Sequence, residues 1–178
     1  SLNAVYVELN QNVGGSVQNA IDAIGLALSS HLFLGEGNFF ENVYITDASL
    51  LNFTLSGATT GAGTTLFNVD PNDPNITIAN TLGTTIENLT IEAENKTGIY
   101  VHDALGTTIR DNTINNSRTG IAVVNSGGFV ASDNEINNAY GHGISLAGVT
   151  LFSLTGNHIN NVVEEGIPTV NRGILVTD

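Results

Sequence analysis

Short strand-like phrases return along this chain every 22 or 23 residues, and in each of them apolar residues alternate with polar ones. One phrase reads Thr-Ile-Arg-Asp-Asn-Thr-Ile over residues 108–114, and its counterparts occupy residues 130–136 and 154–159. Alternation with a period of two predicts strands with one buried face. A fixed repeat of this length predicts a solenoid in which every repeat forms one coil. We therefore expect a parallel β-helix, an all-β fold in one structural domain.

A second set of strand-like segments follows the same repeat. Its members begin with Gly-Ile and occupy residues 98–101, 120–123 and 143–146. The next member is either Gly166-Ile167, which has the right spacing but is followed by Pro168, or Gly173-Ile174. Proline lacks the N–H group that a strand ladder needs, so we place the strand at Gly173-Ile174, after a seven-residue insertion.

One asparagine recurs at a fixed position of the repeat, as Asn112, Asn134 and Asn157. Asparagine tolerates the left-handed backbone conformation, and its side-chain amide can bond to the turn of the next coil. We therefore predict a structural asparagine ladder at a bend between strands. Leu89 occupies the equivalent position one coil earlier, so the ladder should begin at Asn112.

The N-terminal part of the chain has a different pattern. Residues 4–9 alternate as a strand, and Ser16 precedes a segment reaching to about Leu28 in which apolar residues recur at helical spacing. Such an amphipathic helix would cover the backbone edge and the apolar interior of the first coil. We therefore expect an N-terminal strand and capping helix in residues 1–30, followed by β-helix coils in residues 31–178.

Three further strands are expected in the first coils, at residues 31–34, 39–45 and 51–55, and a protruding loop at residues 70–75. The sequence stops at Asp178, in the middle of a coil and without a capping element. We therefore expect the natural polypeptide to continue beyond this truncated coil. An uncapped coil also permits end-to-end self-association.

The order of elements in the first coils resembles that of a known family. A helix leads into a strand, a glycine-rich turn ends in two phenylalanines, and the phrase Glu-Asn-Val-Tyr-Ile at residues 41–45 precedes Leu-Asn-Phe-Thr-Leu-Ser-Gly at residues 51–57. In this order the chain resembles the right-handed parallel β-helix proteins of the pectin lyase-like type, of the kind found in bacterial secreted and surface proteins. The resemblance covers nearly the whole chain and implies a right-handed β-helix. It specifies the fold more closely than an activity.

Composition narrows the classes of partner. Four basic residues stand against seventeen acidic ones, which gives a formal net charge of -13. A field of this sign repels phosphate backbones and anionic lipids, so we expect no nucleic acid partner and no membrane insertion by this segment. The sequence contains no cysteine, which excludes disulfides and thiolate metal sites. Its polar, acidic composition is typical of a secreted or cell-surface scaffold.

The segment Gly-His-Gly around His142 resembles a segment of the polygalacturonases, inverting glycosidases of the pectin lyase-like fold. Inversion requires one carboxyl group that assists the leaving oxygen and a second that activates water. The matching positions of the two preceding coils hold Arg118 and Lys96 rather than carboxylates. We therefore interpret His142 as a turn histidine rather than a catalytic one.

Should the protein be an enzyme, we expect its catalytic groups among His142, Asp103, Asp111 and Asp133. Asp111 and Asp133 occupy one column in adjacent coils, about 5 Å apart by the usual strand spacing, where two carboxylates repel unless a cation lies between them. They are therefore candidate metal ligands, with a solvated acidic stripe as the alternative. We expect no cofactor, and calcium is the one ion that we keep as a candidate. The loop at residues 70–75 has a calcium-like composition without the spacing of an EF-hand loop.

Two classes of function remain open from the sequence. We favour a non-enzymatic segment of a larger bacterial secreted or cell-surface protein, which acts as an adhesin or passenger scaffold or as a glycan-binding rod. Its partner would be a polysaccharide or a host-surface molecule, and Tyr44, Tyr100 and Tyr140 could stack on sugars. The alternative is a polysaccharide lyase, hydrolase or epimerase whose active site lies partly outside this sequence.

Overall fold

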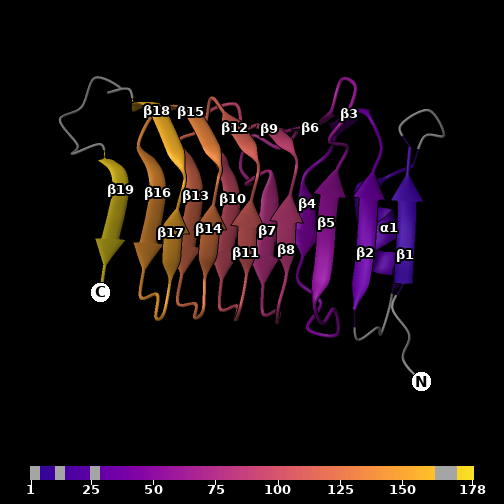
Figure 1. The fold of residues 1–178 in the computed structure, drawn as a ribbon, viewed down its shortest axis with the longest axis horizontal. Coiled ribbons are helices and arrows are strands. Elements are labelled where there is room, and N and C mark those ends of the chain that lie inside the picture. Colours follow the sequence, from indigo (N-terminus) through magenta and orange to yellow (C-terminus); the bar gives the residue numbers. More distant parts are fainter. Residues whose placement is uncertain (1–4, 11–14, 25–28, 163–171) are drawn as a thin grey trace.

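The computed structural model describes residues 5–10, 15–24, 29–162 and 172–178, and it shows a right-handed parallel β-helix (Figure 1). Three parallel sheets run along its axis, and each described coil contributes one strand to each sheet. Sheet 1 consists of β1 (Val5–Leu9), β2 (Ser30–Leu34), β5 (Phe53–Gly57), β8 (Thr85–Glu87), β11 (Thr108–Arg110), β14 (Val130–Ser132) and β17 (Ser153–Thr155). Sheet 2 consists of β3 (Gly37–Phe40), β6 (Thr64–Phe67), β9 (Thr90–Glu92), β12 (Thr113–Asn115), β15 (Glu135–Ala139) and β18 (His158–Val162). Sheet 3 consists of β4 (Val43–Ile45), β7 (Ile76–Ala79), β10 (Thr97–His102), β13 (Thr119–Val124), β16 (His142–Ala147) and β19 (Arg172–Thr177).

Columns of like residues form the core between the three sheets. In sheet 2, Ile91, Ile114, Ile136 and Ile159 pair across successive coils. The first three of these side chains are fully buried. Burying one such side chain stabilises the fold by about 1.5–3 kcal/mol, and β-branched residues suit a pleated strand. The repeated isoleucines of the sequence therefore stabilise the stack of coils.

Left-handed residues produce the bends between sheets 1 and 2. Asn88, Asp111 and Asp133 have φ angles of 56°, 55° and 54° at this bend. Asn112 and Asn134 follow the left-handed residues and do not themselves have positive φ. The reason that we gave for the asparagine ladder was therefore wrong in one respect. The preceding aspartate makes the left-handed turn, and the asparagine that follows supplies the hydrogen bonds.

The strand predicted at residues 39–45 is in fact two strands on different sheets. β3 ends and β4 begins on either side of a bend at Glu41 and Asn42. The Asn42 side chain is buried there and donates to the Pro74 carbonyl oxygen at 2.7 Å. The buried hydrophobic residues Phe39 and Val43 lie four positions apart, so their spacing alone fits one continuous strand, although the buried Asn42 breaks the alternation of burial. The hydrophobic pattern consequently gave no sign of the bend.

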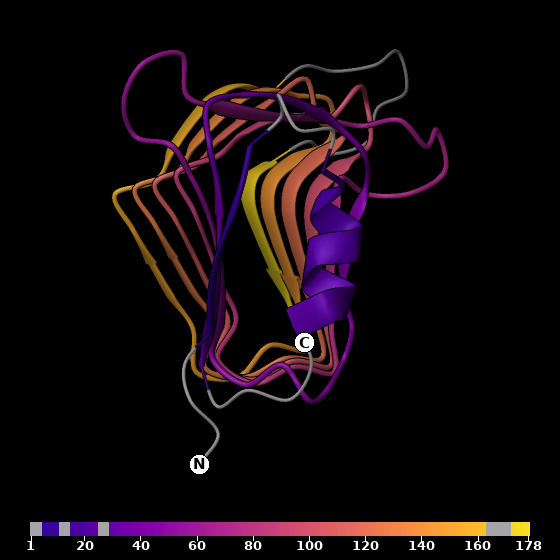
Figure 2. The same cartoon turned by 90° about the vertical axis from the view of Figure 1, so that its right-hand side faces the viewer.

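The second coil is longer than the others because two loops interrupt it. Leu55 pairs with Ile86, 31 positions later, whereas the coils between Ile86 and Ala131 repeat every 22 or 23 positions. The last coil is also longer, since Ile144 pairs with Ile174, 30 positions later. Residues 58–63 lie between β5 and β6, and residues 68–75 lie between β6 and β7. The second of these loops contains the loop predicted at residues 70–75. Figure 2, a view along the axis, shows both loops standing out from the outline of the coils.

The N-terminal helix covers the first coil, as the sequence predicts. α1 (Val17–Ile24) buries Val17 and Ile21 against the core, and the rest of the predicted helix, to Leu28, lies outside the described residues. Figure 2 shows the helix beside the strands of sheet 3 at the N-terminal end. β1 pairs in parallel with β2, so the N-terminal strand continues sheet 1 directly.

Two side chains join α1 to the edge of the first coil. The Glu41 carboxylate accepts hydrogen bonds from the Ser16 hydroxyl at 2.9 Å, the Val17 N–H at 2.6 Å and the Gln18 N–H at 3.1 Å. It therefore satisfies amide groups that every helix start leaves without partners. The Gln18 amide accepts from the Tyr44 N–H at 2.7 Å and donates to the Tyr44 carbonyl oxygen at 3.1 Å. This side chain takes the place of a neighbouring strand at the edge of β4.

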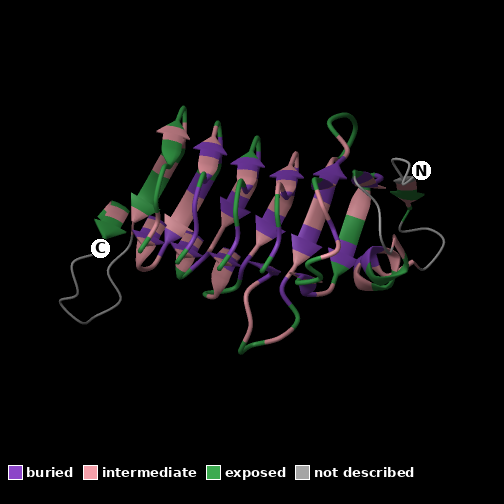
Figure 3. Ribbon diagram, turned by 90° about the horizontal axis from the view of Figure 1, so that it is seen from below, coloured by how far each residue is buried: buried purple, intermediate pink, exposed green. Residues whose placement is uncertain are grey.

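The last described coil contains the strand that we placed at Gly173-Ile174. β19 pairs with β16 through Ile144 and Ile174, whereas the alternative position at residues 166–167 lies outside the described residues. Ile174 and Val176 are 47% and 50% exposed, and Figure 3 shows β19 largely in the colour of exposed residues. End-to-end association through this coil stays a prediction. In the part of the chain that is described, no helix has the length and apolarity needed to cross a membrane.

Replacing Glu41 by alanine should destabilise the protein by about 1–2 kcal/mol, because the helix start and the Ser16 hydroxyl lose their shared acceptor. Glu36 offers a matched control, since its carboxylate is exposed and accepts one bond of 3.4 Å from the Ala62 N–H. We expect Glu36→Ala to stay within about 0.5 kcal/mol of the parent. Urea unfolding followed by circular dichroism measures both changes. Equal effects of the two substitutions would show that the cap contributes nothing specific.

Candidate functional site

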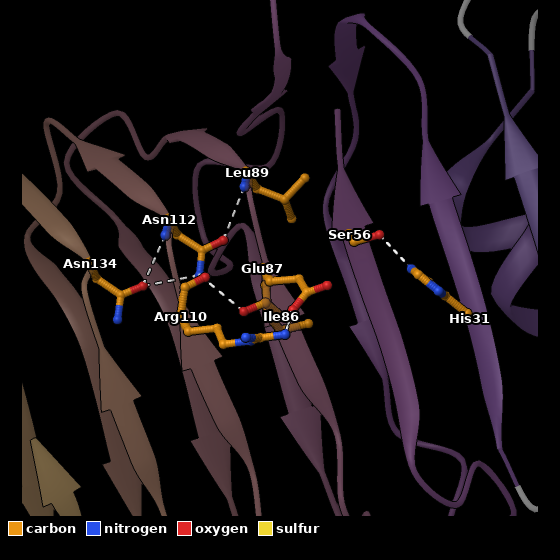
Figure 4. A network of polar contacts seen from close by, with 8 residues as sticks. All are labelled: His31, Ser56, Ile86, Glu87, Leu89, Arg110, Asn112 and Asn134. Carbon is orange, nitrogen blue, oxygen red and sulfur yellow. Dashed lines mark hydrogen bonds and ion pairs between the residues drawn. The ribbon is translucent and has the colours of Figure 1, made fainter. Parts of the chain in front are cut away.

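The predicted asparagine ladder forms inside the bend between sheets 1 and 2 (Figure 4). The Asn112 amide donates to the Asn134 side-chain oxygen at 3.0 Å and to the Ile86 carbonyl oxygen at 3.1 Å, and it accepts from the Leu89 N–H at 3.1 Å. Asn134 donates in turn to the Asn157 side-chain oxygen at 2.9 Å. Asn112 and Asn134 are each 1% exposed. These amides use their hydrogen-bonding capacity within the fold, so the ladder is structural.

Of the four candidate catalytic residues, Asp111 and Asp133 lie in equivalent positions of adjacent coils, and Asp103 and His142 lie elsewhere. Asp111 and Asp133 lie in the bend between sheets 1 and 2, where their backbone is left-handed. Asp103 follows sheet 3, and its carboxylate lies 2.9 Å from Nδ1 of His102. His142 begins β16, and its Nδ1 accepts from the backbone N–H of Arg172 at 3.2 Å.

Asp111 and Asp133 form the left-handed turns of their coils, and this role requires no cation. The third member of their column is Gly156, and a Cβ there would lie 2.1 Å from Oδ1 of Asp133. The aspartate side chain therefore packs over the glycine of the next coil. Within the described ranges, no three histidine, aspartate or glutamate side chains gather as a metal site would require. Calcium binding by Asp111 and Asp133 stays a prediction.

Polar side chains on the outer face of sheet 1 are paired with each other. The Arg110 guanidinium forms an ion pair with the Glu87 carboxylate in the neighbouring strand. His31 and Ser56 share a hydrogen bond between Nε2 and Oγ (Figure 4). Ser56 is 2% exposed, so its hydroxyl is not available to a ligand. These four side chains are therefore engaged within the protein.

Sheet 2 carries a row of asparagines on its outer face that sequence reasoning missed. Asn115, Asn137 and Asn160 pair across β12, β15 and β18. Asn160 donates to Asn137 at 3.0 Å, and Asn137 donates to Asn115 at 3.1 Å between side-chain atoms. Asn115 donates to Oε1 of Glu92 at 2.7 Å. We call these three asparagines the strand row.

A second row runs beside it at the following bend, and we call it the bend row. Asn161 donates to Asn138 at 3.3 Å, and Asn138 donates to Asn116 at 3.1 Å. Asn116 donates to Oε2 of Glu92 at 3.2 Å, so both rows end on the same carboxylate. Asn116, Asn138 and Asn161 have φ angles of 52°, 57° and 56°. The left-handed role that we had predicted for the inner ladder belongs to this bend row.

The backbone conformation of the strand row does not explain why these residues are asparagines. Its members occupy strand positions without positive φ, where asparagine has a low propensity. Each side chain offers two N–H donors and two acceptor lone pairs. Among the described contacts, Asn137 uses one N–H toward Asn115 and one lone pair toward Asn160. One donor and one acceptor of Asn137 are therefore free for an external ligand.

Two stacked phenylalanines continue the line of the strand row toward the N-terminus. Phe40 pairs with Phe67 in register, and Phe67 pairs with Glu92. The rings stack with centroids 4.8 Å apart and an interplanar angle of 15°. The Phe40 side chain is 62% exposed. We call Phe40, Phe67, Glu92 and the strand row together the sheet 2 track.

The signal for this track was present in the sequence. The pair Asn-Asn follows an inward isoleucine at residues 115–116, 137–138 and 160–161, with the spacing of the coils. We had assigned the asparagine repeat to the more obvious Asp-Asn and Gly-Asn positions. The exposed phenylalanine pair could not be found in this way, because the bend inside residues 39–45 was missed.

The tyrosines that we had proposed for sugar stacking are divided between two places. Tyr44 and Tyr100 lie in one outer column of sheet 3, two coils apart, with Thr77 between them. The Tyr100 ring lies 5.1 Å from the His102 ring between centroids. Tyr140 follows β15 and does not belong to this column. Sheet 3 therefore offers separated rings rather than a continuous platform.

Comparison with known proteins agrees with this architecture. Residues 23–178 match the family described as right-handed β-helix region, and the chain belongs to this family. A Parabacteroides merdae protein, named provisionally as a glycosyl hydrolase, has a similar structure, with a TM-score of 0.70 at 12% identity over 96% of each chain. The pectin methylesterase of Aspergillus niger gives a TM-score of 0.47 at 12% identity, over 97% of this chain and 88% of that one. Similarity at this level of identity shows the fold alone. No curated protein sequence matches the chain.

We predict that Asn134→Ala destabilises the protein by about 2–3 kcal/mol, because buried groups of Asn112, Ile109 and Asn157 lose their partners. Asn137→Ala is the matched control on the outer face, where water can replace the lost bonds, and we expect a loss below about 1 kcal/mol. Urea midpoints and slopes measure both losses. An outer substitution as damaging as the inner one would contradict the distinction between the two kinds of asparagine.

Tyr44 should titrate at unusually high pH. Its hydroxyl donates to Oδ2 of Asp73 at 2.6 Å. This hydrogen bond raises the pKa of Tyr44 from 10.0 to about 12, and burial and the charges of Asp73 and Asp70 add to the shift. The neutral phenol therefore contributes stability that is complete below pH 10 and is lost as the pH rises toward 12.

We expect Asp73→Asn to lower the pKa of Tyr44 toward 10, measured as phenolate absorbance with Tyr44→Phe as the subtracted reference. Asp70→Asn removes only a distant charge and should lower this pKa less. An unchanged titration in Asp73→Asn would show that the hydrogen bond is not formed in solution.

Proposed function

We propose that this β-helix binds a polysaccharide along the sheet 2 track. One observation carries the proposal: Phe40, Phe67, Glu92 and the strand row form a straight line of outward side chains across six coils. A polysaccharide presents hydroxyl groups and the flat apolar faces of its sugar rings. The track offers partners of both kinds, since exposed rings stack on sugar faces and free amide groups bond to hydroxyls.

The repeat of the track suits a polymer better than a small molecule. Equivalent residues of neighbouring coils lie about 4.8 Å apart along the axis, as in any parallel sheet. A ligand with a repeating unit therefore meets one amide group after another in the same orientation. Among the described contacts, each carbonyl oxygen of the strand row keeps at least one lone pair for a hydroxyl, and Asn115 and Asn137 also keep one N–H. Several such contacts add affinity along the length of the polymer.

A binding role agrees better with the described residues than a catalytic one. Among the residues that we had considered for catalysis, Asp103 and His142 lie apart from Asp111 and Asp133. Those two carboxylates belong to a left-handed bend, where Asp133 packs over Gly156 of the next coil. The preference for a non-enzymatic role gains no support from the Parabacteroides merdae structure, whose provisional name is that of a hydrolase. That name does support a carbohydrate as the ligand class. The proposal places the protein outside the cell, secreted or on a bacterial surface, as an adhesin, a passenger scaffold or a glycan-binding rod.

Affinity electrophoresis against a panel of soluble polysaccharides tests the proposal. We expect retention by at least one polymer, and we expect Phe40→Ala and Asn137→Ala each to weaken it by about fivefold, the effect of roughly 1 kcal/mol. Thr108→Ala, on the outer face of sheet 1, is the control that should leave retention unchanged.

Two results would contradict this proposal. Retention that is equal in the parent and in both track variants would place the ligand on another face. New reducing ends or unsaturated products would show that the chain acts on the polymer, in favour of the lyase, hydrolase or epimerase alternative. Urea unfolding of each variant separates a loss of binding from a loss of fold.

A further inference from the structure

We propose that the polysaccharide on the sheet 2 track is neutral. This inference rests on the proposed function and adds the chemical class of the ligand. The argument depends on which charges lie on the track, which charges lie beside it, and how the track recognises hydroxyl groups.

The outer face of sheet 2 carries no lysine or arginine among the described residues. Its outward positions are Asn38, Thr65, Thr90, Thr113, Glu135 and His158 in one column, and Phe40, Phe67, Glu92, Asn115, Asn137 and Asn160 in the other. Only two of these side chains carry a fixed charge at neutral pH, and both are glutamates. The whole chain has a net charge of -13, so the longer-range field has the same sign.

The basic residues of the chain lie elsewhere. Arg110 is paired with Glu87 on sheet 1, and Arg172 begins β19 in sheet 3. Lys96 and Arg118 occupy adjacent coils at the entry to sheet 3, where the Arg118 N–H donates to the Lys96 carbonyl oxygen at 2.8 Å. These two residues lie beyond the bend row and not on the track. An acidic polymer would have to leave the strand row to reach them.

A uronate on the track would meet like charges. Glu92 already accepts hydrogen bonds from Asn115 and Asn116, and Glu135 lies next to the strand row, 3.5 Å from the Asn160 amide nitrogen. A ligand carboxylate beside either group is repelled, and this repulsion is weakly screened at low salt. Neutral hydroxyl groups meet no such penalty, and the free N–H and carbonyl groups of the strand row suit them. The charge of the track therefore selects against acidic sugars.

Pairs of polymers that share a backbone and differ in charge test this inference. Hydroxyethylcellulose and carboxymethylcellulose form one pair, and fully methyl-esterified and de-esterified homogalacturonan form another. At low salt we expect the neutral member of a retained pair to bind about fivefold or more tightly than its acidic partner. Raising the salt concentration should narrow this difference, because screening weakens the repulsion.

Two variants identify the groups responsible. Glu135→Gln should improve retention by the acidic polymers by about twofold to threefold and leave the neutral ones unchanged. The double variant Lys96→Gln, Arg118→Gln should not weaken retention of the neutral polymers. The inference would be overturned if the parent bound the acidic polymer more tightly than the neutral one and the double variant lost this preference. That result would leave the proposed binding function standing. Absence of retention by every polymer would instead refute the proposed function, and the inference with it.

Discussion

The register between successive coils is the constraint on which the rest of this structure depends. Each coil is bound to its neighbours by parallel backbone hydrogen bonds, and a residue therefore faces its equivalent 22 or 23 positions away. Any side chain that recurs at this interval becomes a column along the axis. Isoleucine in such a column forms core, and asparagine forms a ladder of amide hydrogen bonds. The same register produces the isoleucine core, the buried asparagine ladder and the candidate binding surface.

The inner and outer asparagines show how burial changes the role of one residue type. The Asn112 and Asn134 amides are enclosed and bond to backbone groups that would otherwise be left without partners. The strand row bonds mainly within itself, on a face that water reaches. An amide in the first position stabilises a bend, whereas an amide in the second keeps a free donor and acceptor. A ligand that fits the coil spacing can use these free groups.

The repeat allowed much of the fold to be predicted from the sequence. The strand columns and the position of the last strand followed from the spacing of Gly-Ile pairs and isoleucines, because residues one repeat apart in a solenoid are neighbours in space. The capping helix followed from apolar residues at helical spacing after Ser16. The bend at Glu41 and Asn42 did not follow, because the buried hydrophobic residues on its two sides, Phe39 and Val43, have the even spacing of a single strand. The sequence did not indicate the capping contact of Glu41 either, because this contact joins residues 23 to 25 positions apart and occurs at one place rather than in every coil.

Prediction of the site was less successful, because the sequence does not show which side of a bend a residue faces. Asp111 and Asp133 drew attention as carboxylates in one column, yet their column is a left-handed turn that requires such residues. The Asn-Asn pairs at residues 115–116, 137–138 and 160–161 were visible and regular, but only the structure shows that the second residue of each pair has a left-handed backbone and the first does not.

The most direct test of this account is a nuclear magnetic resonance titration of the asparagine side-chain amides with a retained polysaccharide, cut to soluble oligosaccharides. We predict that the signals of Asn115, Asn137 and Asn160 shift with increasing oligosaccharide, while those of Asn112 and Asn134 stay in place. Shifts confined to side chains of sheet 1 or sheet 3, with the strand row unaffected, would contradict the account.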